Sequence, residues 1–195
     1  MRINYEAFFW GIIIYLFCTS TFFTIRVTLF KKKLTSAGKK FELKSGTGVK
    51  FERAIDGDEI AVSHENQNFI VRILGIKSFD PTVNESGIAV IARQGLAYLD
   101  NGLKGKNLVL NFTKFTRDKK NRVLAYVESD GIDIGLQMVK KGITVVYTLH
   151  PFSRMDNYLS LEKQAMKAST GLWGNKETKK RALAWQISWV KKTEK

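Results

Sequence analysis

The 195-residue chain has one cysteine, Cys18, and two histidines, His64 and His150. A single cysteine cannot close an intrachain disulfide, so a disulfide-stapled framework is excluded. The histidines lie far apart in separate loop-like segments and show no metal-ligand spacing, so a histidine metal site is not predicted. Acidic residues are also scarce, because 18 Asp and Glu oppose 32 Lys and Arg and leave a net charge of +14. This basic excess favours polyanionic partners, either nucleic acid or an anionic membrane surface.

Charged residues are absent from residues 7–25, which are apolar and rich in aromatic side chains. As a helix this run would span about 28 Å, close to the thickness of a bilayer's hydrocarbon core. A cleaved signal peptide and an uncleaved anchor both fit such a run. Phe22 and Phe23 lie where a cleavage site would need small residues, which favours the anchor. We therefore predict a single-pass transmembrane anchor within residues 1–33, with membrane contact through residues 7–25.

The charged residues on either side of this run indicate which side of the membrane the globular part occupies. Residues 31–33 are all lysine, whereas the opposite flank carries Arg2 and Glu6. The positive-inside rule then places the globular part on the cytoplasmic side. Residues 34–48 are polar and are predicted to be a linker.

The rest of the chain is predicted to form an α+β domain. Five segments have the length and composition of β-strands, and three have helical periodicity. The predicted strands are residues 49–55, 59–63, 69–76, 108–115 and 123–128, and the predicted helices are residues 87–101, 132–141 and 153–169. Five strands with inserted and appended helices fit a small closed barrel.

Three motifs near these strands combine carboxylates with arginines. They are Asp56-Gly57-Asp58, Arg72-Ile-Leu-Gly-Ile-Lys77 with Asp80 shortly after it, and Arg122-Val-Leu-Ala-Tyr126. Carboxylates attract a hard cation, and guanidinium forks match the oxygens of a phosphate. The combination predicts cleavage of a phosphodiester.

With Leu161-Glu162-Lys-Gln-Ala165 and Gly171-Leu172-Trp173, these motifs resemble the staphylococcal-nuclease-like (thermonuclease) family. The resemblance covers residues 49–175. It implies a five-stranded OB-type barrel with helices packed on it. It also implies hydrolysis of single-stranded or flexible DNA or RNA with one bound calcium ion. Many members of that family act outside the cytoplasm, which disagrees with the sidedness that the flanking charges favour.

The resemblance assigns roles to individual residues. It places Asp58 as a metal ligand, Arg72 and Arg122 on the phosphate, and Asp80 where a glutamate positions or activates water. Asp56 has the same strand parity as Asp58, so it is predicted as a second metal ligand.

Four positions depart from the family pattern, and two of them are active-site positions. Lys77 stands where a second metal-binding carboxylate is expected, and Asp80 replaces the glutamate. Phe79 replaces a proline, and Glu59 replaces a threonine and is predicted to point to the opposite face of the strand. Three outcomes follow for Lys77. It moves aside for the metal, it replaces the metal beside the phosphate, or catalysis is lost. The leading hypothesis is a membrane-anchored, metal-dependent nuclease, and the alternative is a catalytically impaired nucleic-acid-binding module.

Further contacts with nucleic acid are predicted for Lys77, Lys119, Lys120 and Tyr147. The lysines suit phosphates, and a tyrosine ring stacks on any base, so little sequence specificity is expected. The domain is expected to be monomeric, with no protein partner. The basic tail, residues 176–195, could pack on the barrel, lie on a membrane or add to nucleic-acid binding.

Overall fold

The computed structural model describes residues 43–83 and 86–193, together with residues 10, 15–17, 19, 21 and 25. The chain divides into two units, Met1–Glu42 and Leu43–Lys195. Among the described residues, no helix is long and apolar enough to cross a membrane. Most residues of the predicted anchor lie outside the described residues, and the anchor stays a prediction.

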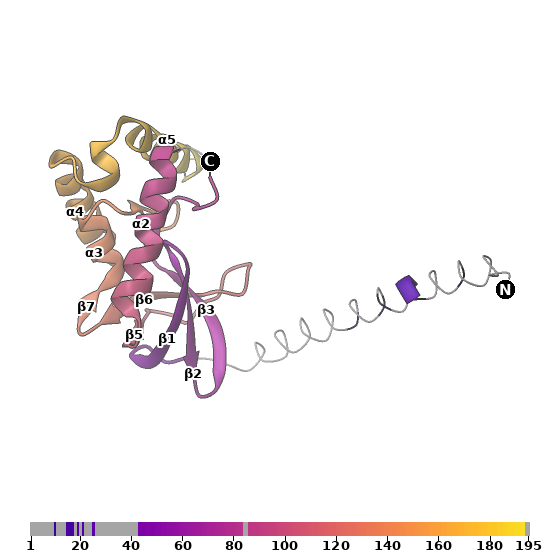
Figure 1. Ribbon diagram of the computed structural model, residues 1–195. Helices are drawn as coiled ribbons and strands as arrows, with labels where there is room; N and C mark the ends of the chain where they lie inside the picture. Colours follow the sequence, from indigo (N-terminus) through magenta and orange to yellow (C-terminus); the bar gives the residue numbers. More distant parts are fainter. Residues whose placement is uncertain are drawn as a thin grey trace. The chain divides into compact units, whose positions relative to one another are not determined.

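The second unit is built on a closed five-stranded barrel (Figure 1). Three strands form an antiparallel meander: β1 (Thr47–Asp56), β2 (Glu59–His64) and β3 (Gln67–Ile73). β5 (Asn107–Asn111) pairs with β1, and β6 (Val123–Ser129) pairs with β5. A parallel pairing of β3 with β6 closes the ring. The predicted α+β barrel is confirmed.

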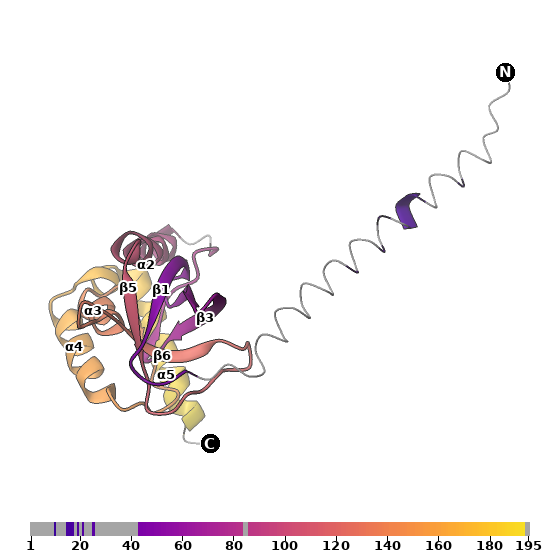
Figure 2. The same ribbon diagram turned by 90° about the horizontal axis from the view of Figure 1, so that it is seen from below.

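Five helical segments accompany the barrel. They are α2 (Ser86–Leu103), α3 (Ile134–Lys140), α4 (Met155–Lys167), the 3-10 turn η1 (Gly171–Gly174) and α5 (Lys176–Thr193). α2 lies along β1, and α3 and α4 lie side by side next to the barrel (Figures 1 and 2). The barrel interior is apolar, with Ile60, Val71 and Leu108 fully buried. A second core joins α2, α4, η1 and α5.

The predicted strand over residues 69–76 is broken in the structure. Gly75 has φ of 83°, and a Cβ atom there would lie 2.7 Å from the ring of Phe152. The chain therefore turns after β3, and β4 (Ile76–Lys77) pairs instead with β8 (Val145–Val146). This break carries Lys77 out of the barrel sheet and into a small separate sheet.

Two other predicted elements change at their ends. The strand over residues 108–115 stops at Asn111, and the backbone N–H of Phe112 donates to Ser45 Oγ at 3.0 Å. The helix over residues 132–141 begins later, because Ile132–Asp133 form the short strand β7. Asp133 then caps α3 by accepting a hydrogen bond from the backbone N–H of Leu136 at 3.1 Å.

Glu162 on α4 ties three elements together from a buried position. It accepts hydrogen bonds from the Val146 backbone N–H and the Gln186 side-chain amide, both at 2.8 Å. Burial raises the pKa of Glu162 from 4.5 to about 7. Between these two values the unfolded chain has lost this proton while the folded chain keeps it, so this group makes stability fall as pH rises.

The Glu162→Gln variant removes this pH-dependent cost. We expect its stability relative to wild type to improve by about 2 kcal/mol between pH 5 and pH 8. Urea unfolding of both proteins at the two pH values measures the difference. An equal difference at both pH values would contradict the buried, protonated glutamate.

Candidate active site

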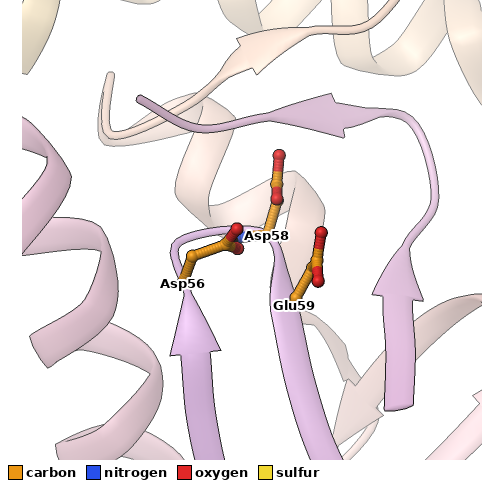
Figure 3. A group of neighbouring side chains, drawn as sticks. All are labelled: Asp56, Asp58 and Glu59. Atoms are coloured by element: carbon orange, nitrogen blue, oxygen red, sulfur yellow. Dashed lines mark hydrogen bonds between the residues drawn. The ribbon is translucent and has the colours of Figure 1, made fainter. Parts of the chain in front are cut away.

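The tip of the β1–β2 hairpin gathers three carboxylates. Asp56 ends β1 and pairs in register with Glu59, the first residue of β2. A Cβ atom on the intervening Gly57 would lie 2.7 Å from the Ser78 Cβ, so only glycine fits this turn. The carboxylate oxygens of Asp56, Asp58 and Glu59 lie within 4.8 Å of one another (Figure 3).

Asp58 is the buried centre of this cluster, with no solvent exposure. Its Oδ2 accepts from the Ser78 backbone N–H at 2.7 Å and pairs with Arg72 Nη1 at 2.5 Å and Lys77 Nζ at 3.3 Å. Burial raises the pKa of Asp58, but the charges of Arg72 and Lys77 more than offset it and hold the pKa below its ordinary value. Its other oxygen, Oδ1, is buried without a hydrogen-bond partner. The carboxylate is therefore ionised with one oxygen unused.

Asp56 has a different electrostatic setting. Its Oδ1 accepts the Asp58 backbone N–H at 2.8 Å. Partial burial, and then the adjacent negative charge of Asp58, raise the pKa of Asp56 to about 6. Two neighbouring carboxylates that resist joint ionisation are stabilised by an added cation.

Arg72 is fixed beside the cluster. It lies on β3 opposite Glu59 and is 9% exposed. Its guanidinium donates to the backbone oxygens of Asp58 at 3.1 Å and Ile76 at 2.9 Å, besides pairing with the Asp58 carboxylate. The break after β3 supplies the Ile76 oxygen, so the predicted arginine is positioned by backbone as well as by charge.

Arg122 faces the same site from the loop that precedes β6. Its Nε donates to Asp118 Oδ2 at 2.6 Å, and its Nη1 and Nη2 pair with Glu59 and Asp118. Asp118 is itself held by the backbone N–H groups of Lys120 and Arg122. Glu59 therefore belongs both to the carboxylate cluster and to the clamp on Arg122.

Asp80 lies at the edge of the site and is exposed. Its Oδ1 accepts hydrogen bonds from the Thr82 backbone N–H at 2.8 Å and the Thr82 hydroxyl at 2.6 Å. These bonds lower the pKa of Asp80, so the group is ionised at neutral pH. This turn holds the Asp80 carboxylate in place. The family resemblance assigned this residue the role of positioning or activating water.

A groove of about 1140 Å³ brings most of the predicted site residues together. Its lining includes Asp56, Arg72, Lys77, Asp80, Lys120, Arg122 and Tyr147, with Asp58 buried beside it. Lys119 is exposed on the same loop as Lys120 but does not line the groove.

The groove lining also includes residues that were not among the predicted site residues, and the charged and aromatic ones that matter most here are Glu59, Asp118, Trp185 and Trp189. Strand parity placed Glu59 on the opposite face, but the turn at Gly57 breaks that parity and brings its carboxylate into the cluster. Asp118 could have been found from sequence, because an acid four residues before Arg122 indicates an ion pair with that arginine.

Among the described residues, Asp56, Asp58 and Glu59 form the group of side chains suited to a metal ion. Three carboxylates and a buried oxygen without a donor fit a hard divalent cation, which prefers oxygen ligands. Lys77 opposes the cation, because its ammonium already lies 3.3 Å from Asp58 Oδ2. The donor set fits a metal, and Lys77 competes with it.

Several known proteins are similar in sequence to this chain. An uncharacterized protein of Bacillus anthracis is 30% identical over 124 residues, covering 62% of this chain and 58% of that protein. The SPbeta prophage-derived endonuclease YokF of Bacillus subtilis (strain 168) is 28% identical over 128 residues, covering 64% of this chain and 43% of YokF. The chain therefore spans about half the length of these relatives.

The thermonuclease of Staphylococcus hyicus is 22% identical over 124 residues, which cover 63% of this chain and 73% of that enzyme. The family model described as staphylococcal nuclease homologue matches residues 71–175, which include Arg72, Asp80 and Arg122. With the barrel and the arginine–carboxylate site in place, the match establishes that this chain belongs to the staphylococcal nuclease homologue family.

Proposed function

We propose that this chain is a nuclease that hydrolyses phosphodiester bonds of DNA or RNA with a divalent metal ion and little sequence specificity. The main support is that Arg72 and Arg122 line one groove and that Arg72 pairs with the buried Asp58 beside it. Relatives named endonuclease and thermonuclease support the same reaction class.

The chain's own residues would act mainly by positioning and by charge. Arg72 and Arg122 present guanidinium forks to the phosphate, and each fork can bind two oxygens. Arg122 reaches the phosphate as Glu59 and Asp118 give up part of their hold on it. Asp80 would orient the attacking water, as an ionised carboxylate that accepts a hydrogen bond from it.

The divalent ion is assigned to Asp56, Asp58 and Glu59, and calcium is the ion that the family resemblance implies. It would supply neutralisation of the phosphate charge and a more acidic bound water. Glu59 provides a carboxylate that compensates for the one lost at Lys77. Because it also holds Arg122, Glu59 couples the metal site to the phosphate site.

Charge-neutral variants of the cluster test this assignment. Asp56→Asn and Glu59→Gln keep the size and hydrogen-bonding capacity of each side chain but remove its charge. We expect each to raise the calcium concentration for half-maximal cleavage of single-stranded DNA about tenfold. Asp130→Asn is the matched control, because Asp130 pairs with Lys106 and does not line the groove. An unchanged calcium requirement in both cluster variants would contradict the assignment.

A second function is favoured by one contact. The ion pair of Lys77 with Asp58 supplies a positive charge where the metal would bind. A site neutralised in this way could bind nucleic acid without cutting it. Chelator separates the two functions, because it stops a metal-dependent nuclease and leaves a binding module active.

We also propose that residues 7–25 anchor the protein in a membrane, on the support of their uncharged, apolar sequence. The full-length chain should then stay with the membrane pellet after alkaline extraction. Recovery in the supernatant would contradict the anchor. Protease accessibility in intact cells would report the side of the membrane.

A further inference from the structure

Four aromatic rings form a cluster at the groove, called here the aromatic wall: Tyr147, Trp185 and Trp189 line the groove, and Phe79 packs against Trp185 without lining it. Trp185 and Trp189, one turn apart on α5, are stacked with ring centroids 6.0 Å apart and an interplanar angle of 28°. Phe79 packs against Trp185 at 4.8 Å, and Tyr147 meets Trp189 edge-on at 4.9 Å. The rings therefore form one continuous cluster.

The four rings differ in solvent exposure. Phe79 is 2% exposed and Trp189 is 7% exposed, so both belong mainly to the core beneath. Tyr147 and Trp185 are only half-buried, and both line the groove. Both also pack against the second core. The buried pair therefore supports the other two rings, which remain accessible at the groove.

The aromatic wall is connected through the backbone to Arg72, one of the two arginines assigned to the phosphate. Tyr147 follows β8, whose residues Val145 and Val146 pair with Lys77 and Ile76 of β4. The Tyr147 backbone N–H also donates to the Gly75 oxygen at 2.9 Å. Ile76 in turn is the residue whose carbonyl oxygen holds Arg72. The paired strands β4 and β8 therefore connect the Tyr147 ring to the Arg72 guanidinium.

This arrangement matches the chemistry of an unpaired nucleotide chain. Such a chain alternates phosphates, which suit Arg72, Arg122 and Lys120, with flat bases, which suit aromatic rings. A base inside a duplex is stacked on its neighbours and cannot reach such a wall.

We propose that Trp185 adds a base-stacking contact to the one expected of Tyr147, next to the phosphate held by the arginines. Trp185 belongs to α5, which begins after the segment matched to the family, residues 71–175. The Trp185 contact therefore comes from a helix outside the matched segment, whereas Tyr147 lies within that segment. The inference rests on the proposed function, because it takes the arginines as the phosphate site.

The test measures binding in chelator, so that cleavage does not intervene. The full-length chain is titrated against a labelled oligothymidylate and against an abasic oligonucleotide of the same length and charge, with anisotropy as the readout. Wild type should bind the base-bearing oligomer about tenfold or more tightly. Trp185→Leu should lose this preference and keep its affinity for the abasic oligomer, whereas Trp185→Phe should retain most of the preference.

Ile187→Ala is the matched control on the same helix, because Ile187 is 58% exposed and does not line the groove. Thermal unfolding of each variant identifies a loss caused by misfolding, and Trp185→Phe keeps the test decisive if the leucine variant unfolds. Equal wild-type affinities for the two oligomers, or an equal loss for both in Trp185→Leu, would overturn the subsite. The subsite would also be overturned if Trp185→Leu weakened binding to anionic lipid vesicles but left binding to both oligomers unchanged. That result would assign the aromatic wall to a membrane.

The failure of this inference is distinguishable from that of the proposed function. Wild type that cleaves single-stranded DNA in calcium but shows no base preference overturns the subsite alone. Wild type that binds neither oligomer in chelator and does not cleave single-stranded DNA in calcium overturns both.

Discussion

Replacing Arg122 by lysine is expected to slow cleavage of single-stranded DNA about a thousandfold. Lysine keeps the positive charge between Glu59 and Asp118 but cannot present two parallel donors to a phosphate. The loss should therefore fall on the chemical step and leave the fold intact. Single-turnover cleavage rates measure the effect, and circular dichroism verifies folding.

Arg117→Lys is the matched control for this experiment. Arg117 lies on the same loop, donates to the Asn121 backbone oxygen and packs over the Phe115 ring, but it does not line the groove. Its replacement should leave the cleavage rate unchanged. A comparable rate in the two variants would show that Arg122 serves only to hold the loop.

Replacing Lys77 by methionine is expected to tighten calcium binding by about 10- to 100-fold. Calcium must displace the Lys77 ammonium from Asp58, and the cost of that step is bounded by the strength of the ion pair. The Lys77 side chain is 36% exposed, so screening limits the pair to about 1–3 kcal/mol, which corresponds to this change in affinity. Methionine removes the charge and keeps most of the side-chain volume.

Lys77→Asp extends the same experiment, because it removes the competing charge and adds a carboxylate. Its calcium affinity should exceed that of Lys77→Met. Calorimetry on the full-length chain measures binding without reference to catalysis. Lys119→Met is the control for the loss of one lysine, since Lys119 is exposed outside the groove. Equal affinities in wild type and both Lys77 variants would contradict competition between the ammonium and the metal.

Much of the barrel and the centre of the site could be predicted from sequence. Asp58, Arg72 and Arg122 belong to motifs whose order along the chain fixes their places in the barrel. The structure brings Arg72 within 2.5 Å of Asp58, and Arg72 and Arg122 line one groove. The strand boundaries of β1, β2 and β6 also agree closely with the predicted segments.

Three features depended on tertiary structure. The carboxylate of Glu59 reaches the cluster because Gly57 turns the chain so tightly that alternation along a strand no longer applies. The chain breaks at Gly75 with a positive φ, and a side chain at this position would collide with Phe152, a residue remote in sequence. The aromatic wall depends on contacts of α5 with Phe79 and Tyr147, which follow β4 and β8, and periodicity along α5 alone could not distinguish this packing from a membrane-facing helix.

The most direct test of the proposed metal-dependent hydrolysis follows cleavage and binding in the same samples of full-length wild type. Single-stranded DNA and RNA are incubated with calcium, with magnesium or with chelator, and both products and retained complexes are measured. Cleavage that requires a divalent ion and stops in chelator, with binding retained, is the expected result. Binding without cleavage under all three conditions would contradict it and would identify the chain as a nucleic-acid-binding module whose metal site is blocked by Lys77.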